Sequence, residues 1–376
     1  MNRFSGKTVG FSLFKTVVLI LFTLLLSFTV QAQIRHLIFF GDSLSDSGNN
    51  FWVKSGGPHQ GAPITNRSAT GERRIWTEYF TRIFEDSRQG GQARSLQVSS
   101  KAIHPGIHLN YAWASAETGR HYLSDNSGKP YFPSRDNECR QPGLFADSRG
   151  EVQPCVPSVG LQVQQFIQQH GKDPEYIKSS LVVMLAGGND ILNNLGKLLS
   201  ENRLKILLTQ GLSHPIDNTL LNIKVLHRAG VPYSNMLVLG LPDFSLIPAI
   251  HKLVNNNASA LSMLSQISSA YNRWLQFRLW WETLFSDQAI TFYNPTSFLN
   301  DLAVNGSYET IDGASLEFSQ GLIPCHQKPE EPERPGCDQH IFYNLKHPSS
   351  QAHRAFADDL WRHLLRQKPL AAKLSS

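Results

Sequence analysis

Residues 36–50 read HLIFFGDSLSDSGNN, and this stretch decides the fold. Its first five residues form a short apolar run, which is typical of a strand buried on both faces. The Gly-Asp-Ser turn that follows places Ser43 at the carboxyl edge of the predicted sheet, where α/β proteins build their sites. Because Gly-Asp-Ser alone is also a common turn or helix cap, Ser43 needs partners before it indicates chemistry.

The rest of the chain alternates apolar runs with segments of helical period. Strands separated by helices imply parallel crossovers, so the sequence predicts an α/β protein: a three-layer α/β/α sandwich around a central, mainly parallel sheet. The predicted strands cover residues 36–40, 181–186, 236–241 and 289–293, and the predicted helices cover 75–84, 161–170, 191–199, 204–229, 258–284 and 349–365.

The predicted helix at 258–284 carries an aromatic stripe. Trp274, Phe277 and Trp281 recur at helical spacing, with Trp280 beside them. Such a stripe can bind a ligand, but core packing is the more common cause, so these rings are expected in the core.

Composition excludes several classes of protein. The 376 residues are 41% hydrophobic and 17% charged, which is ordinary for a folded domain and excludes disorder, collagen and coiled coils. The formal net charge is +5, and it falls to about +2 without the three basic residues near the N-terminus. A nucleic-acid-binding protein needs a concentrated basic face, so no nucleic-acid partner is expected.

The first 32 residues are typical of an export signal. Arg3, Lys7 and Lys15 precede the uncharged apolar run at 16–30, and small residues at Val30 and Ala32 suit a signal peptidase. An uncleaved membrane anchor is the alternative, but a spanning helix needs about 20 apolar residues. We therefore expect a signal peptide at 1–32, a single domain at 33–376, and a destination in the periplasm, at the cell surface or in the medium.

The four cysteines agree with export. Two turn-rich segments, near 119–157 and 305–337, hold all of them and resemble insertions in the domain. Four cysteines allow three pairings, of which the local ones are preferred because each would staple a loop that has no core of its own. The pairs are then Cys139 with Cys155 and Cys325 with Cys337. Their spacing does not match structural zinc, and no metal or other cofactor is expected.

Three further segments could supply partners for Ser43. His347 lies before a helix start marked by Pro348 and Ser349, where a short turn could hold a general base. Asn189 follows the predicted strand at 181–186 in the sequence AGGND, and its amide could donate to an oxyanion or cap a helix. The segment NYAWASA at 110–116 offers small residues with available backbone N–H groups.

Together these segments resemble the ordered blocks of the GDSL lipolytic enzymes, which belong to the SGNH hydrolase superfamily. The match rests on FGDSLSDSGN at 40–49, GGND at 187–190 and HPS at 347–349, in the right order over most of the chain. The export signal, the sequence RIWTEY at 74–79 and the cysteine pairs resemble the secreted bacterial branch of phospholipases A, lysophospholipases and glycerophospholipid:cholesterol acyltransferases. The resemblance implies a flavodoxin-like sandwich.

The resemblance also implies roles for single residues. Ser43 would be the nucleophile and His347 its base, with an acyl-Ser43 intermediate. The oxyanion donors would be the Ser43 N–H, the Asn189 amide and a backbone N–H of the 110–116 segment. The family has a glycine pair there where this chain has Ala114-Ser115, so Ser115 is preferred and Ala114 is the alternative.

A larger departure from the family pattern is Asn344, which stands where the family has Asp three residues before the catalytic His. In a serine protease triad this Asp-to-Asn change costs ~10⁴ in turnover. Three interpretations are open. His347 could be oriented by the Asn344 oxygen or a backbone carbonyl, another acid such as Asp338 or Asp46 could substitute, or the scaffold could be a binding module.

The preferred function is a secreted serine esterase that releases or transfers fatty acyl chains from phospholipids or lysophospholipids. A polysaccharide acetyl-esterase is the enzymatic alternative, and a catalytically weakened GDSL scaffold that binds a surface or lipid is the other. The expected partners are a lipid ester, a membrane surface or a sterol acceptor, and the protein is expected to be a monomer.

Overall fold

The fold is taken from a computed structural model, in which the chain divides into two compact units, residues 1–33 and 34–376. The predicted signal peptide and Cys139 lie outside the described residues, so cleavage after Ala32 and the pairing of Cys139 with Cys155 stay predictions. The structure describes residues 33–49, 74–88, 94–99, 107–119, 143–146, 152–192, 195, 213–327 and 336–374.

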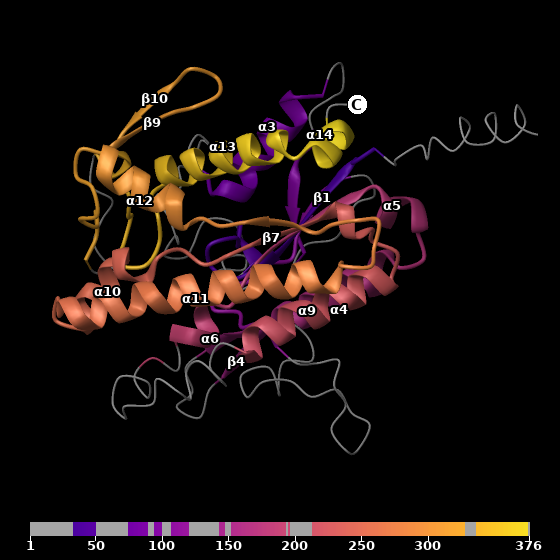
Figure 1. Ribbon diagram of the computed structural model, residues 1–376, viewed down its shortest axis with the longest axis horizontal. Helices are drawn as coiled ribbons and strands as arrows, with labels where there is room; N and C mark the ends of the chain where they lie inside the picture. The colour runs from indigo at the N-terminus through magenta and orange to yellow at the C-terminus, as the bar shows by residue number, and fades with distance from the viewer. Residues whose placement is uncertain are drawn as a thin grey trace, which may run out of the picture. The chain divides into compact units, whose positions relative to one another are not determined.

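A parallel sheet forms the centre of the second unit (Figure 1). Every pairing in it is parallel, as the alternation of strands and helices predicted. The central strand β1 has β3 on one side and β6 on the other, and all three end near one another. The strand order is β2 (Leu96–Val98), β3 (His108–Asn110), β1 (His36–Gly41), β6 (Ser180–Leu185), β7 (Met236–Leu239) and β8 (Thr291–Tyr293).

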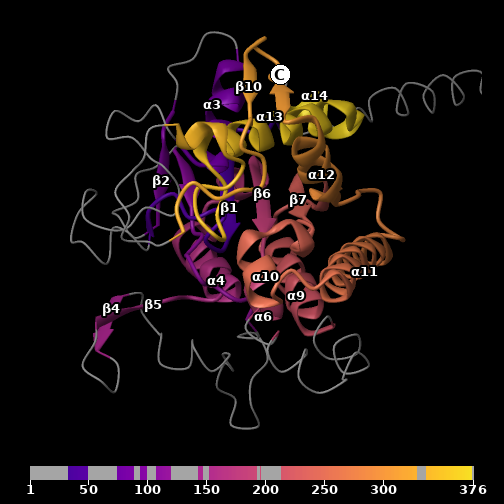
Figure 2. The ribbon, with the colours of Figure 1, turned by 90° about the vertical axis from the view of Figure 1, so that its left-hand side faces the viewer.

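Helices cover both faces of this sheet, which confirms the three-layer architecture (Figures 1 and 2). Alternate residues of β1 point to opposite faces: Phe39 packs in one apolar cluster and Phe40 in the other. One layer contains α3 (Trp76–Asp86), α13 (Ser350–Arg366) and α14 (Lys368–Leu374), and the other contains α4 (Val159–His170), α9 (Ser213–Arg228) and α11 (Ala258–Glu282).

Local sequence explains where the helices start. Ser158 caps α4 by accepting from the Leu161 N–H, and Asn257 caps α11 by accepting from the Ala260 N–H at 3.0 Å. Ser349 caps α13 in the same way, directly after Pro348, as predicted. The cap fixes the end of the turn that carries His347.

Most of the shorter elements were not predicted, and neither were β2 and β3. The predicted helix at 191–199 overlaps the end of α6, and most of its remainder lies outside the described residues. β2 (LQV) and β3 (HLN) each contain a polar residue and no apolar run that marks a strand. The turn-rich segments hold two antiparallel hairpins. The hairpins are β4 (Gly143–Ala146) with β5 (Val152–Cys155), and β9 (Ser307–Glu309) with β10 (Ser315–Glu317); the short helices are α5 (Pro174–Lys178), α6 (Gly188–Leu192), α10 (Pro248–Leu253), α12 (Thr296–Asn305), η2 (Tyr233–Asn235), η3 (Phe244–Leu246) and η4 (Cys337–Gln339).

The prediction for the aromatic stripe of α11 is wrong. Trp274, Phe277 and Trp281 are 46%, 45% and 58% exposed. The helix turns a second stripe toward the core instead, and both stripes have the same helical spacing, so periodicity could not choose between them. The buried stripe contains Leu264, Ile267, Ser268, Tyr271, Asn272, Leu275 and Leu279.

None of the helices in the described part of the chain combines the length and the apolar composition of a membrane span.

Candidate active site

Ser43 lies in a tight turn at the carboxyl end of β1. The strand ends at Gly41, where a Cβ would lie 2.3 Å from the Leu185 carbonyl oxygen of β6, so only glycine allows this close approach. The Asp42 carboxylate then accepts from the Leu44 N–H at 3.0 Å, and the Asp42 carbonyl accepts from the N–H groups of the next turn. Ser43 therefore stands at the bend, half-buried, with its side chain at the sheet edge.

The His347 ring reaches Ser43 from the other end of the chain. Its Nε2 lies 2.9 Å from the Ser43 Oγ, and its Nδ1 lies 3.2 Å from the Asn344 Oδ1. Because the Asn344 Oδ1 can only accept, the Nδ1 carries the proton, and the Nε2 then presents its lone pair to the hydroxyl. This is the tautomer that a general base needs.

Asn344 also builds the turn that positions His347. Its Oδ1 accepts from the backbone N–H groups of Lys346 and His347, both at 2.9 Å. The Tyr343 N–H donates to the His347 carbonyl at 2.9 Å and closes the turn. Asn344 therefore fixes the backbone and the ring of His347 with the same oxygen atom.

The electrostatic state of His347 follows from its surroundings. Burial lowers the pKa of its imidazole to about 4, and the charge of Lys346 acts in the same direction. The ring is therefore neutral, and able to accept a proton, over the whole neutral range. No carboxylate in the described part of the chain hydrogen-bonds to this ring, so an imidazolium formed during a reaction has only the amide oxygen of Asn344 to stabilise it.

Ser115 and Asn189 lie at the carboxyl ends of the strands on either side of β1. Ser115 follows β3 and has a φ of +71°, a conformation that glycine adopts most easily. This explains the glycine that the family resemblance led us to expect there. Asn189 lies in the first turn of α6, and its Nδ2 donates to the Ala116 carbonyl at 2.9 Å, next to Ser115.

The backbone N–H groups of Ser115 and Ala114 differ in their hydrogen bonds. The Ala114 N–H is already occupied, since it donates to the Asp46 Oδ2 at 2.9 Å. The N–H groups of Ser43 and Ser115 have no acceptor among the described residues, and the Asn189 amide keeps a second hydrogen. Ser43, Ser115 and Asn189 can therefore donate to an oxyanion, and Ala114 cannot.

Comparisons with known proteins identify the family. The sequence pattern described as "GDSL-like Lipase/Acylhydrolase" matches residues 37–360. The chain belongs to this family. A curated relative, "GDSL esterase/lipase 7" of Arabidopsis thaliana, is 22% identical over 339 residues, which cover 85% of each chain. A solved structure of the lipase Lip_vut3 from a goat rumen metagenome shares 12% identity, with 87% of this chain and 96% of that chain covered and a TM-score of 0.41.

Membership in the GDSL family makes the chain a carboxylic ester hydrolase of the lipase and esterase type. The three interpretations of Asn344 can now be compared. Asp46 is not available to His347, because its carboxylate accepts from the N–H groups of Gly48, Asn49 and Ala114. Asp338 lies in η4 and makes no hydrogen bond to the ring. The geometry therefore favours orientation of His347 by the Asn344 oxygen.

Sequence reasoning missed the network behind the GDSL turn. The buried Asn49 donates from its Nδ2 to the carbonyls of Asn110 and Ala112, both at 2.9 Å. The buried Asn110 donates in return to the Ser45 carbonyl at 2.6 Å. Together with Asp46, these side chains tie the nucleophile turn to the segment that carries Ser115. The pattern DSGNN at 46–50 was the available signal.

Two carboxyl groups lie close behind the site. Burial raises the pKa of Asp42 to about 7, and the nearby Asp190 raises it further. Burial also raises the pKa of Asp190, to about 6, although this carboxylate accepts from the N–H and the hydroxyl of Thr118. These groups hold the Ser43 and Asn189 turns in place and are protonated in part near neutral pH.

An apolar cavity of about 100 Å³ lies beside the turns of Ser43 and His347, at the carboxyl ends of β6, β7 and β8. The neighbours of Ser43 and His347 in the chain, Leu44, Lys346 and Pro348, form part of its wall. Lys346 supplies its charged group. The remaining wall is aromatic, aliphatic or histidine: Trp76, Leu185, Pro242, Ile247, Pro295, Phe298, Leu299, Leu302, Ile341, Phe342, Ala352, His353 and Phe356.

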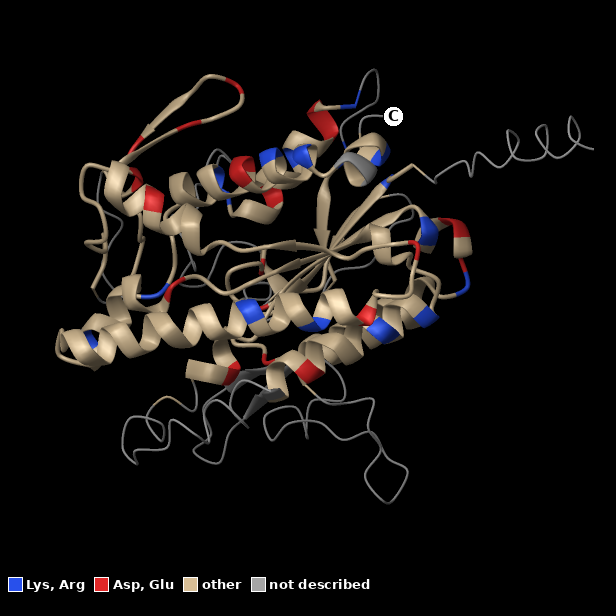
Figure 3. Ribbon diagram, viewed as in Figure 1, with Lys and Arg blue, Asp and Glu red and all other residues tan. Residues whose placement is uncertain are grey.

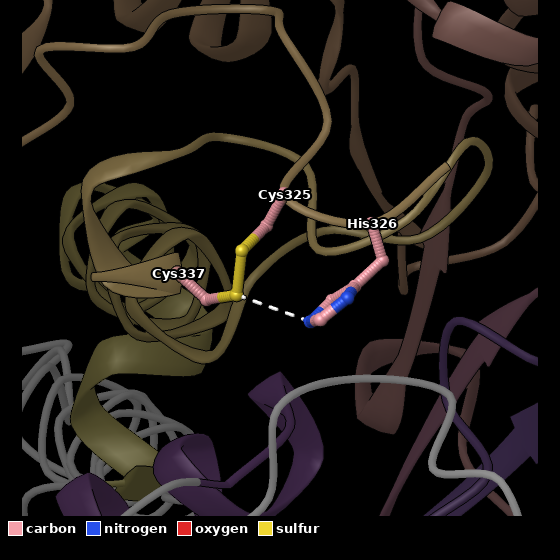
Figure 4. Close-up of side chains that lie close together, drawn as sticks. All are labelled: Cys325, His326 and Cys337. Carbon is pink, nitrogen blue, oxygen red and sulfur yellow. Dashed lines mark hydrogen bonds between the residues drawn. A yellow bond between two sulfur atoms is a disulfide. The ribbon is translucent and has the colours of Figure 1, made fainter. Parts of the chain in front are cut away.

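The predicted Cys325–Cys337 disulfide is present, and it braces the His347 turn. The Cys325 N–H donates to the Phe342 carbonyl at 3.0 Å, and the His326 N–H donates to the Tyr343 carbonyl at 2.8 Å, just before Asn344. The His326 Nε2 also lies 3.3 Å from the Cys337 Sγ (Figure 4). Because the two sulfurs are bonded to each other, this Cys-His-Cys group offers no thiolate to a metal.

Proposed function

We propose that Ser43 is the nucleophile of a lipolytic esterase and that His347 is its general base. The hydrogen-bond chain from the Asn344 Oδ1 through His347 to the Ser43 Oγ carries this proposal. The His347 Nε2 takes the hydroxyl proton as the Ser43 Oγ attacks the ester carbonyl carbon. The N–H groups of Ser43 and Ser115 and the Asn189 amide stabilise the oxyanion.

The second half of the reaction uses the same groups. The protonated His347 gives its proton to the leaving alcohol, and an acyl-Ser43 ester remains. Water, or another hydroxyl, then loses a proton to the His347 Nε2 and attacks this ester, which releases the acyl group and restores the Ser43 hydroxyl. A sterol hydroxyl in this step would make the enzyme an acyltransferase, because the acyl group would move to the sterol.

The cavity wall supports a fatty acyl chain as the group that is transferred. Its surface near Ser43 and His347 is apolar, so it favours a hydrocarbon chain over the hydroxyl-rich surface of a sugar. We therefore prefer phospholipids and lysophospholipids over acetylated polysaccharide as substrates. The apolar segment at 16–30 supports export, and the proposed place of action is the periplasm, the cell surface or the medium.

Hydrolysis of defined esters tests the proposal. We expect the purified protein to release fatty acid from phosphatidylcholine and lysophosphatidylcholine, and to prefer long acyl chains over acetyl in a series of p-nitrophenyl esters. The Ser43→Ala variant should lose both activities, and cholesteryl ester formed in the presence of cholesterol would identify a transferase. Activity that survives in Ser43→Ala would overturn the nucleophile, and a preference for acetyl esters would overturn the substrate class.

A further inference from the structure

The outer face of α11 exposes a cluster of large aromatic side chains, which we call the α11 patch. It consists of Trp274, Phe277, Trp280 and Trp281 together with Leu284 and Phe285 just beyond the helix. Their exposed fractions run from 38% at Leu284 to 97% at Phe285. Proteins rarely expose so many apolar side chains together unless the surface binds something.

The rings of the α11 patch contact one another rather than the core. Ring centroids lie 5.7 Å apart for Trp274 and Phe277, 5.8 Å for Phe277 and Trp280, and 6.2 Å for Trp280 and Trp281. The opposite face of the helix supplies the core contacts through Tyr271 and other residues. The patch is therefore not needed to hold α11 on the sheet.

The charged groups around the patch are few, and most of them are paired with a group of opposite charge. From Ala258 to Trp281 the sequence has Arg273 and Arg278 and no acidic residue (Figure 3). Arg273 is exposed beside Trp274, and Arg278 lies 2.8 Å from Asp217 of α9. Glu282 is neutralised by Lys224 at 2.9 Å. Asp287 is exposed two residues after Phe285, and Arg273 is the exposed cation beside the rings that an anionic headgroup can contact.

A lipid surface suits this combination better than a protein does. Tryptophan prefers the boundary between water and hydrocarbon, because its ring is apolar and its N–H is polar. Arginine can bury its stem while its guanidinium stays among the headgroups. Phe285 projects from the turn after α11 with almost all of its side chain exposed, which suits insertion into a soft phase rather than the pockets of a protein interface.

We propose that the α11 patch docks the protein on the surface of an anionic phospholipid bilayer. The aromatic side chains lie at the headgroup boundary with Phe285 as the deepest group, and Arg273 lies beside them against the lipid phosphates. This role is separate from the chemistry of Ser43, since the patch contains none of the residues at the carboxyl edge of the sheet.

The test uses Ser43→Ala protein, so that no lipid is consumed. Binding is measured by sedimentation with vesicles of phosphatidylcholine alone and of phosphatidylcholine with phosphatidylglycerol. We expect binding to the anionic vesicles, and a blue shift of the tryptophan emission, because Trp274, Trp280 and Trp281 are exposed to water in the free protein. Brominated lipids should quench the shifted emission.

Matched variants locate the contact. Trp280→Ser with Trp281→Ser should weaken vesicle binding at least about tenfold, because half-exposed rings lose their lipid contact. Ile311→Ser removes an apolar side chain that is 51% exposed in the β9–β10 hairpin and should change nothing. Arg273→Gln should weaken binding to anionic vesicles about fivefold and leave binding to neutral vesicles unchanged. The control Arg82→Gln on α3 should leave vesicle binding unchanged.

Three results would overturn the proposal: unchanged binding in the Trp280→Ser, Trp281→Ser protein, equal loss in the Ile311→Ser control, or a dimer in vesicle-free solution that the tryptophan variant dissociates. The last result would assign the patch to a second copy of the chain. With Ser43 restored, unchanged hydrolysis of a soluble ester shows that the patch variants fold. Failure of vesicle binding is thereby distinguished from failure of the proposed esterase activity.

Discussion

The Asn344→Asp substitution tests how this site works without a carboxylate beside its histidine. In the native chain an amide oxygen orients His347 but carries no full charge, and burial lowers the pKa of the ring to about 4. An aspartate at 344 can accept hydrogen bonds from the same backbone N–H groups of Lys346 and His347, so the turn should be kept. The substitution therefore adds a negative charge with little change in geometry.

The magnitude follows from the 3.2 Å between the Asn344 Oδ1 and the His347 Nδ1. A unit negative charge about 4 Å from the imidazolium charge attracts it by about 4 kcal/mol at an effective dielectric constant of about 20. This attraction is the upper limit of the effect of the substitution on catalysis. An opposite charge at this range raises a pKa by about 1–3 units. The pKa of His347 should rise from about 4 to between 5 and 7, and kcat should increase between about 10-fold and about 1000-fold.

A pH profile of kcat/KM on a soluble p-nitrophenyl ester separates the charge effect from other effects. The general base must be neutral, so activity falls as pH drops through the pKa of His347 in the free enzyme. The acid limb of the native enzyme should lie near pH 4, and that of Asn344→Asp should lie one to three units higher. Asn344→Ala, which removes both the acceptor and the turn, should lose activity at every pH.

The stability of the protein should show the same shift independently of turnover. A histidine with a lowered pKa stabilises the fold when it is neutral, and this contribution is lost as pH falls from the unfolded value of 6.5 toward about 4. In Asn344→Asp the loss over this window should shrink, as urea unfolding at pH 4.5 and 7.5 can measure. An unchanged or lower kcat with the acid limb still near pH 4 would refute the reasoning.

Three other parts of the structure give predictions. Asn189→Ala should lower kcat about 10²–10³-fold with little change in KM, because an oxyanion donor acts in the transition state. A rise in KM of the same size with kcat unchanged would contradict this role. Gly187→Ala should lower the free energy of unfolding in urea by about 2–4 kcal/mol, because the φ of Gly187 is +109° and a Cβ would lie 2.4 Å from the Tyr271 hydroxyl oxygen. Adding Tyr271→Phe should restore part of that stability. Cys325→Ser with Cys337→Ser should lower the unfolding free energy by about 3 kcal/mol and lower kcat, because the disulfide braces the His347 turn; unchanged kcat would show that the brace is not needed.

The main elements of the fold could be predicted because their sequence patterns are local. The strand at 36–41 is buried over its whole length and contains the apolar run at 37–40. Ser349 and Pro348 mark the start of α13 through capping chemistry that acts within one turn. The three-residue strands β2 and β3 could not be found, because the neighbouring strand β1 selects their conformation through long-range pairing.

The aromatic stripe of α11 shows a different limit of the sequence. Tyr271, Leu275 and Leu279 form one apolar stripe, and Trp274, Phe277 and Trp281 form another on the other side of the helix. Both have the 3.6-residue period, so hydrophobicity identifies the helix but not its orientation. Orientation depends on whether the sheet has room for a large indole or a smaller leucine, which is a property of the packed layers.

Asn344 and Asp46 show why the site needed the structure. From sequence, a missing aspartate before His347 and a spare aspartate at 46 suggested that one could replace the other. The structure separates their tasks, because Asp46 accepts from three backbone N–H groups and fixes the segment beside Ser115, while the Asn344 oxygen holds His347. The long GDSL motif therefore does more than present a nucleophile. Its polar residues position the proposed oxyanion donor Ser115, which lies more than sixty residues away. A loss of Asp46 should harm that donor while the Ser43–His347 pair stays intact.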